Sequence, residues 1–171
     1  MSKSRIAVLC GILLMGSAVH AATVLVAVMQ NEQAPATALQ MSSAMEDQIL
    51  GAYFDWGHIV TNDEITSEGS SFTEKGYGLG PARAVWADFM LVILLEYSPV
   101  EVVDSSLGIT YARLSGISWR MVQVRDGIIL VEKKLPPTSV PVSEPDPYRR
   151  ARILADTIAK ESRDALLGAR R

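Results

Sequence analysis

The stretch from residue 45 to residue 65, MEDQILGAYFDWGHIVTNDEI, gathers the side chains of this sequence that best suit acid–base chemistry. His58 stands near its centre, with Asp55, Asp63 and Glu64 close by in the sequence. A histidine acts as a general base when a carboxylate orients its ring and a nucleophile or substrate group lies within hydrogen-bond reach. One hypothesis is therefore a small hydrolase in which His58 works with Asp55 and Asp63.

The other groups that such chemistry needs are missing from the sequence pattern. Ser70 and Ser71 are the nearby candidate nucleophiles, but EGSSF is not a nucleophile elbow. His58 is the only histidine outside the N-terminal apolar segment, which contains His20, and one histidine is too few for a typical catalytic zinc site. The carboxylates also lack the spacing of a calcium loop. We therefore predict that the chain is not an enzyme and holds neither metal nor cofactor. In this interpretation His58 joins a helix to a strand, where its cationic form would favour the negative end of the helix dipole.

A glycine-rich segment offers a candidate for binding rather than catalysis. The sequence GYGLGP at residues 76–81 has a proline where a dinucleotide-binding loop needs its last glycine, and no clear strand precedes it. We interpret residues 63–80 as a long polar loop. Loops of this length are often functional, so this one is a candidate contact surface, with Tyr77 as the aromatic anchor.

Basic side chains are concentrated in the second half of the chain. Residues 32–104 hold 12 acidic and 2 basic side chains, whereas residues 105–171 hold 12 basic and 7 acidic ones. The two halves could form faces of opposite potential, or they could interleave in the fold. The candidate binding residues of the basic half are Arg149, Arg150 and Arg152. They could contact an acidic protein or, peripherally, an anionic membrane surface, and they also suit a solvated helix face.

The N-terminus has the organisation of a secretory signal peptide. A basic start precedes an apolar run over residues 6–19, and small residues follow. We predict cleavage after Ala21, which would make residues 1–21 the signal peptide of a periplasmic or secreted protein. The alternative is an uncleaved anchor, because the apolar character continues to residue 29 and could span a bilayer.

Cysteine usage narrows the chemistry further. Cys10 is the only cysteine and lies inside the predicted signal, after Val8 and Leu9 rather than after the small residues of a lipoprotein signal. We therefore predict no lipoprotein, and a processed chain without thiol catalysis or disulfides. Nucleic acid is a poor partner for an exported protein, so the expected partners are envelope proteins. Neither their identity nor the oligomeric state follows from the sequence.

The remaining residues, 22–171, predict a single α/β (α+β) domain. We expect one mixed β-sheet of about five strands with two long helices and one short helix packed on it, in the order β-α-β-α-β-β-β-α. The strands are expected at residues 23–30, 58–62, 89–97, 109–124 and 128–134. The helices are expected from Thr37 or Ser43 to residue 56, over residues 82–87 and over residues 148–167, the last after a proline-rich connector at residues 135–147.

Local signals support these elements. Thr37 with Gln40 has the form of a capping box, and Asp126-Gly127 is a hairpin turn signal. The long fourth strand is expected to be broken near Gly116. One face of the first helix should be buried against the sheet: Met41, Met45, Ile49, Ala52, Tyr53 and Trp56. The polar residues Ser42, Ser43, Glu46, Asp47 and Asp55 should lie mostly elsewhere.

Three phrases of the sequence carry a resemblance to a known group of domains. They are ATALQMSSAMEDQIL with WGHIVTNDEI, then ARAVWADFMLVILLEYS, and then the hairpin turn at residues 124–127. Over about residues 23–167 the chain resembles exported bacterial α/β domains. This group includes the periplasmic domain of the curli secretion protein CsgG, the penicillin-binding-protein activator LpoB and the N-terminal domain of TolB.

The resemblance implies a non-catalytic accessory domain of the cell envelope that acts through protein contact. The chain departs from the group in three respects: it has no lipobox cysteine, no pair of amphipathic membrane hairpins and no propeller repeats. A pore like that of CsgG and a complete TolB are therefore not expected. The function that we expect is an interaction domain in envelope assembly or regulation, with a small periplasmic hydrolase as the alternative.

Overall fold

The computed structural model describes residues 21–136 and 144–169, which contain one five-stranded mixed β-sheet with the strand order β2-β1-β3-β4-β5. The strands are β1 (Thr23–Gln30), β2 (Ile59–Asn62), β3 (Phe89–Asp104), β4 (Ile109–Gln123) and β5 (Ile128–Leu135). Strand β1 pairs in parallel with β2 and β3, and β3, β4 and β5 are antiparallel. The predicted fold class and element order are confirmed. Most of the predicted signal peptide (1–21) and of the predicted proline-rich connector (135–147) lies outside the described residues, at residues 1–20 and 137–143.

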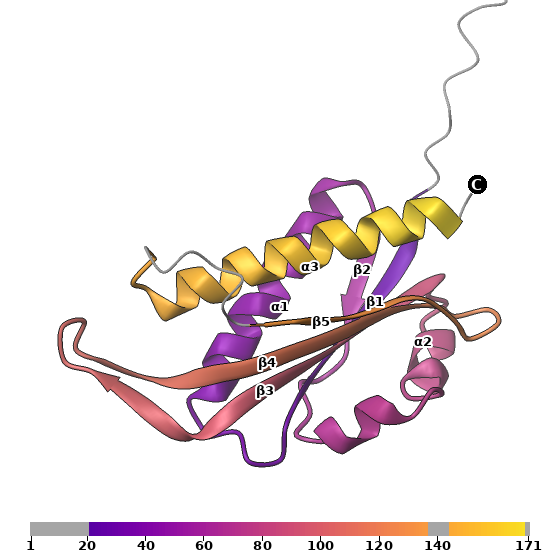
Figure 1. Cartoon of the computed structure of the whole chain (residues 1–171). Helices are drawn as coiled ribbons and strands as arrows, with labels where there is room; N and C mark the ends of the chain where they lie inside the picture. Colours follow the sequence, from indigo (N-terminus) through magenta and orange to yellow (C-terminus); the bar gives the residue numbers. More distant parts are fainter. Residues whose placement is uncertain (1–20, 137–143, 170–171) are drawn as a thin grey trace, which may run out of the picture.

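Helices cover both faces of this sheet. They are α1 (Ala38–Asp55), the 3₁₀ helix η1 (Gly69–Thr73), α2 (Leu79–Ala84) and α3 (Pro147–Ala169). Helices α1 and α3 lie side by side on one face, and α2 lies on the opposite face (Figure 1). In the described parts of the chain, no helix combines the length and the apolar character that a bilayer crossing requires.

The main core lies between the sheet and the pair α1 and α3. Met45, Ile49 and Tyr53 of α1 are fully buried there. They belong to one cluster with residues of β1 and β3: Val24, Val26, Phe89, Leu91 and Ile93. A smaller cluster on the other face includes Phe72, Ala82 and Met90. Since β1 is buried on both faces, its sequence TVLVAVMQ is apolar at every position between Thr23 and Gln30.

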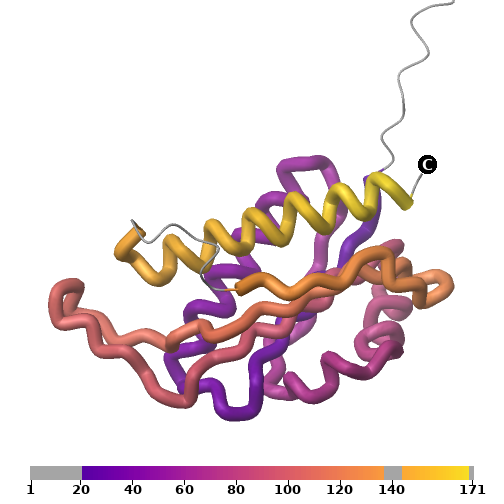
Figure 2. Tube along the Cα trace, in the orientation of Figure 1, coloured from indigo at the N-terminus to yellow at the C-terminus, as the bar shows by residue number. Residues whose placement is uncertain are grey.

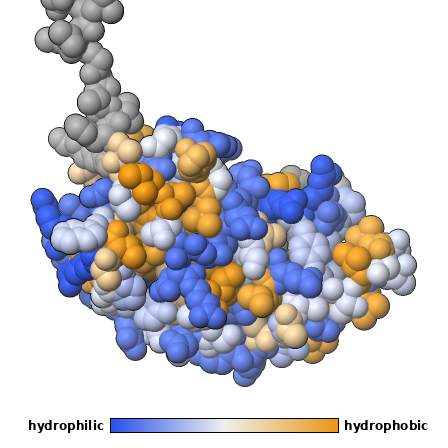
Figure 3. Space-filling view, turned by 180° about the vertical axis from the view of Figure 1, so that it is seen from behind, coloured by the Kyte–Doolittle hydropathy of each residue, from blue (hydrophilic) through white to orange (hydrophobic). Residues whose placement is uncertain are grey.

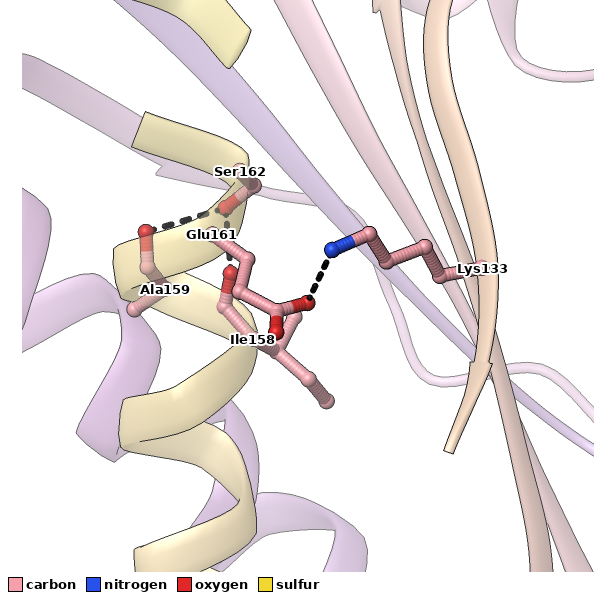
Figure 4. A network of polar contacts seen from close by, with 5 residues as sticks. All are labelled: Lys133, Ile158, Ala159, Glu161 and Ser162. Carbon is pink, nitrogen blue, oxygen red and sulfur yellow. Dashed lines mark hydrogen bonds and ion pairs between the residues drawn. The ribbon is translucent and has the colours of Figure 1, made fainter. Parts of the chain in front are cut away.

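Polar contacts tie α1 and α3 to the rest of the fold. The Ser162 hydroxyl lies 2.7 Å from the carbonyl oxygen of Ile158 and 2.7 Å from the Tyr53 hydroxyl of α1. Lys133 of β5 forms an ion pair of 3.1 Å with Glu161 of α3 (Figure 4). Helix α3 begins at Pro147, one residue before the predicted range of 148–167. The Asp146 carboxylate accepts the backbone N–H of Tyr148 at 2.9 Å and so caps this end of the helix.

Helix α1 differs from its predicted pattern at several positions. Ser42 and Glu46 were expected away from the core, but both are buried. Ser42 is tolerated there because its hydroxyl accepts a hydrogen bond from Gln30 at 2.8 Å and lies 2.9 Å from the Tyr97 hydroxyl. Helical periodicity predicts which face is buried, but it cannot show that a strand facing the helix carries a hydrogen-bond partner for a polar residue.

The two ends of α1 also need correction. Thr37 occupies the N-cap position, but its side chain makes no capping hydrogen bond within the described residues. Its hydroxyl instead donates to the Glu101 carboxylate at 2.8 Å, so the predicted capping box does not form. Trp56 follows the last turn and is only partly buried, with the Arg163 guanidinium 4.5 Å from its ring centre. It is therefore less central to the core than predicted.

The segment 63–80 has more structure than the predicted loop. Thr66 forms an isolated bridge with Met29, and Phe72 in η1 is buried. The Arg120 guanidinium lies 4.9 Å from the Phe72 ring centre and donates a hydrogen bond of 2.6 Å to the Glu74 carbonyl. Burial of Arg120 lowers its guanidinium pKa. These contacts hold the segment against the sheet. The next helix, α2, spans Leu79–Ala84 rather than the predicted residues 82–87.

Strand β3 continues past the predicted strand end at residue 97 to Asp104 and returns through a turn into β4. Residues 98–115 thus form a long hairpin, termed the distal arm, which extends beyond the helices (Figures 1 and 2). Glu96 pairs with Gly116 and Tyr97 with Leu114, which leaves Ser115 as an extra residue in β4. The predicted irregularity near Gly116 is therefore confirmed, and it lies at the base of the arm.

Candidate functional site

The structure gives His58 a buried position between α1 and β2. Its backbone N–H donates to the Tyr53 carbonyl at 3.1 Å, which closes the end of the helix. Its ring nitrogen Nδ1 accepts the backbone N–H of Ala22 at 3.2 Å. This contact requires a lone pair on Nδ1, which the neutral imidazole has and the cationic form expected at the helix end lacks. The interpretation of His58 as a joint between helix and strand fits this geometry.

The carboxylates predicted near His58 are spread along the structure. Asp55 is exposed in the last turn of α1. Asp63 follows β2, where its backbone N–H donates to the Val26 carbonyl at 3.1 Å. The whole of β2 separates Asp63 from His58, and at about 3.3 Å per strand residue this places their backbones roughly 16 Å apart. The described residues also contain no group of three metal-binding side chains.

Tyr77 does not stand free as we expected of a contact residue. It is partly buried and packs against the smaller core cluster that contains Phe72 and Met90. Gly78 beside it has a left-handed backbone (φ 76°) and begins α2. Tyr77 therefore has core contacts that the loop interpretation did not foresee, and replacing it would disturb stability as well as any surface.

The three predicted arginines have different surroundings. Arg149 is exposed and lies 3.7 Å from the Glu144 carboxylate. Arg152 is exposed on the first turns of α3. Arg150 is half-buried and lines a surface hollow of about 320 Å³, termed the distal groove. The structure thus singles out Arg150 from the set.

Three elements that are far apart in the sequence build the distal groove. Helix α1 supplies one apolar wall, the arm supplies a stretch of β4, and the start of α3 closes the other side. The lining residues are Met41, Tyr111, Ala112, Arg113, Leu114, Pro147, Arg150, Ala151 and Leu154. Apolar side chains predominate, and Arg113 and Arg150 add two positive charges. This arrangement suits a segment that carries both apolar side chains and a carboxylate.

The groove continues into the exposed surface of the distal arm. Val100 is 70% exposed and Val103 is 75% exposed, and Leu107 in the turn is also exposed. Seen from behind, hydrophobic surface gathers at the tip of the arm and again at the opposite end of the molecule (Figure 3). Large exposed apolar side chains that gather in one region of a soluble protein often mark an interaction site.

The distal groove offers binding groups rather than reactive ones. Among the described residues that line it, the Tyr111 hydroxyl is the only titratable group besides the two guanidinium groups. Sequence reasoning found Arg150 but missed Arg113 and the arm, because Ser98 and Pro99 suggested a connector. A sequence pattern could have indicated this hairpin: the turn SSLG separates two segments of equal length, VEVVD and ITYAR.

Comparisons with solved structures give distant similarities. The lipoprotein GNA1162 from Neisseria meningitidis is 13% identical, with a TM-score of 0.44, over 83% of this chain and 99% of that one. A PelC dodecamer from Paraburkholderia phytofirmans is 11% identical, with a TM-score of 0.41, over 85% of this chain and 86% of that one. Protein XCC0632 from Xanthomonas campestris is 11% identical, with a TM-score of 0.38, over 85% and 82%.

These identities are too low to transfer a function to this chain. The expected likeness to CsgG, LpoB and the TolB domain is not represented among these three structures, although the α/β class that it implied is correct. A search among curated proteins finds no match. Residues 23–166 match the model of a protein family described as "Uncharacterised protein", and the chain belongs to that family.

Proposed function

We propose that this protein is a non-catalytic interaction domain of the cell envelope, and that a protein partner docks on the distal arm and the distal groove. The observation that carries the proposal is the combination of exposed valines on the arm with Arg113 and Arg150 at its base. Exposed apolar side chains next to two cations provide both contact area and a preference for an acidic segment.

The geometry of the arm supports a contact role. Residues 98–115 form a two-stranded ribbon whose outer part no described helix covers (Figure 1). An isolated hairpin gains little stability from its own pairing, so large apolar side chains at its tip are not explained by folding. A partner that covers Val100 and Val103 would remove this apolar surface from water.

The location in the envelope rests on the N-terminal sequence. The basic start and the apolar run over residues 6–19 predict export, and the resemblance to CsgG, LpoB and the TolB domain favours an accessory role. The partner is then an envelope protein with an acidic and apolar segment. A second copy of this chain is one partner that the experiment would reveal.

Crosslinking in the exporting cell tests the contact directly. A photoreactive residue in place of Val103 should give a discrete adduct, and mass spectrometry identifies its second component. Arg150→Glu should abolish the adduct because it reverses a charge in the groove. Arg152→Glu is the matched control: it makes the same change two residues further along α3, at an exposed position outside the groove, and should leave the adduct in place.

Two results would contradict the proposal. One is the absence of any adduct at position 103 in protein that folds and accumulates normally. The other is an equal loss of the adduct in the Arg150 and Arg152 variants, which would point to overall charge rather than to the groove.

The hydrolase alternative predicts a different pattern of loss. His58→Asn keeps a hydrogen-bond acceptor facing the Ala22 N–H but removes the imidazole. If the protein acts by contact, this variant should keep its cellular role while the Arg150 variant loses it. The reverse pattern in equally stable proteins would favour catalysis through His58.

A further inference from the structure

Trp86 combines full exposure with a strained backbone. Trp86 is 88% exposed. Its backbone φ of 57° is positive, and residues other than glycine rarely adopt a positive φ. The backbone N–H of Trp86 donates to the Arg83 carbonyl at 3.1 Å, and that of Ala87 donates to the Ala82 carbonyl at 3.0 Å. These two bonds form a Schellman motif, in which the position of Trp86 normally carries glycine. Folding therefore does not explain a tryptophan here.

Other large apolar side chains are exposed at the same end of the sheet. This region, termed the proximal end, lies where β1 begins. Its exposed residues are Phe54 (71%), Ile59 (61%), Val85 (45%), Trp86 (88%) and Ile128 (55%). They come from α1, β2, the end of α2 and β5, so the surface extends to both sides of the first residues of β1.

Hydrogen bonds place the start of β1 in the middle of the proximal end. The Asp88 carboxylate accepts the backbone N–H of Thr23 at 2.9 Å, and the Asp88 backbone N–H donates to the Thr23 carbonyl at 2.8 Å. On the other side, the Ile59 backbone N–H donates to the Ala22 carbonyl at 2.9 Å. The chain that precedes residue 21, with its apolar run, therefore joins the domain between Trp86 and Ile59.

Cationic groups lie beside the indole. Arg83 and Arg125 line a surface hollow together with Trp86, Asp88 and Gln123. Asp88 is already bonded to the start of β1. Arg125 is 84% exposed and only loosely paired with Asp126, at 3.8 Å. Two guanidinium groups can therefore reach an anionic surface that meets the indole.

We propose that the proximal end rests on an anionic phospholipid surface, with Trp86 at the level of the headgroups and Arg83 and Arg125 against their phosphates. Tryptophan is enriched at membrane interfaces because its ring is apolar and its N–H is polar. Arginine side chains extend along apolar surface and keep their charge among the headgroups. This proposal does not depend on the protein partner proposed above.

The spread of the apolar side chains favours a surface over a small ligand. A soluble anionic ligand would use the hollow beside Trp86 and leave Phe54 and Ile59 in water. A bilayer can contact side chains on both sides of β1 at once. Membrane contact thus accounts for the whole proximal end, and it leaves the distal arm pointing away from the lipid (Figure 1).

Fluorescence with lipid vesicles tests the proposal on the exported protein. Trp119 is fully buried and Trp56 is partly buried, so Trp86 should dominate any change on binding. Vesicles of phosphatidylcholine with phosphatidylglycerol should shift the emission to the blue, and brominated lipids should quench it. Both effects should vanish in Trp86→Phe, whichever N-terminus the purified protein carries.

Variants then separate the contributions of the indole and the cations. Trp86→Gly relieves the strained backbone, so it should fold at least as well as the natural chain and yet bind vesicles at least tenfold more weakly. Arg83→Gln and Arg125→Gln should each weaken binding to anionic vesicles about fivefold at low salt, and leave binding to neutral vesicles unchanged. Val103→Ser on the distal arm is the control and should have no effect.

Three outcomes would overturn the proposal. The first is an emission spectrum that vesicles do not change. The second is an equal loss of vesicle binding in Val103→Ser and Trp86→Gly. The third is a spectral shift that a soluble anionic polysaccharide produces and vesicles do not, which would assign the hollow to a soluble ligand.

Discussion

The two ends of the sheet expose apolar side chains in different ways. At the distal arm, Val100 and Val103 project from β3, whose hairpin with β4 leaves the domain. At the proximal end, Trp86 and Ile59 project from elements that converge on the start of β1, and Trp86 does so from a left-handed backbone. A ribbon can bend to fit a protein, whereas the proximal end is fixed by several elements at once. The distal arm therefore suits contact with a folded protein, and the proximal end suits contact with a fluid lipid surface.

The largest effect should come from the core that joins the two ends. Trp119 in β4 is fully buried in the main cluster, and truncating such an aromatic typically costs roughly 3–5 kcal/mol. A domain of this size is stable by only about 5–15 kcal/mol. Trp119→Ala should therefore lower the melting temperature steeply and weaken crosslinking at the arm and vesicle binding together. A variant that loses one activity and keeps the other would show that the two ends do not share this core.

The sequence predicted the parts of the fold that depend on simple hydrophobic patterns. The runs TVLVAVMQ and FMLVILLEY became neighbouring buried strands, and Met45, Ile49 and Tyr53 became the buried face of α1. The arm was missed because Pro99 is unusual in a strand, yet a register shift there accommodates it. Long-range pairing of this kind is not visible in a local pattern.

The candidate sites were less predictable than the fold. Arg150 was identified, but its groove depends on Arg113 and Met41, which α3, β4 and α1 bring together from distant positions. The sequence did not single out Trp86 as a candidate contact residue, because its positive φ becomes visible only in the folded chain, at the end of α2. His58 attracted attention by its chemistry, and its actual partner is a backbone N–H of Ala22. Residue type alone did not distinguish these cases.

A variant of intermediate effect, Glu46→Gln, should change the stability of the fold without changing binding at either end. Glu46 is buried in α1, and its Oε1 has no hydrogen-bond partner among the described residues. Burial raises the pKa of this carboxyl above its usual value of 4.5, against a smaller opposing effect of the Asn62 side chain. Ionising this carboxyl is therefore harder in the folded chain than in the unfolded one. Glu46→Gln should raise the free energy of unfolding at neutral pH by on the order of 1 kcal/mol.

The pH dependence gives this prediction its sign. Below about pH 4.5 the carboxyl is protonated in both the folded and the unfolded chain, so Glu46→Gln should bring no advantage there. As pH rises, the unfolded chain loses its proton more readily than the folded one, and the natural protein loses stability relative to the variant. Denaturant titrations across this range measure the difference. Vesicle binding and crosslinking should not change, and an advantage of Glu46→Gln that is largest at acid pH would contradict the assignment.

The smallest effect is also the sharpest test of the contrast between the ends. Trp86→Gly should stabilise the protein by roughly 0.5–1 kcal/mol, because glycine adopts the left-handed conformation that costs other residues energy. Gly127 provides the matched control, since it lies at the same end with φ 71°, and a Cβ placed there would come within 3.3 Å of Leu79. Gly127→Ala should therefore destabilise by about 1 kcal/mol.

At the arm, Val103→Ser should leave the free energy of unfolding nearly unchanged, because its side chain is 75% exposed. Thermal melts of the three variants should thus give a gain, a loss and no change. If Trp86→Gly destabilises the protein instead, the indole contributes to folding, and the strain at Trp86 no longer argues for an external contact at the proximal end.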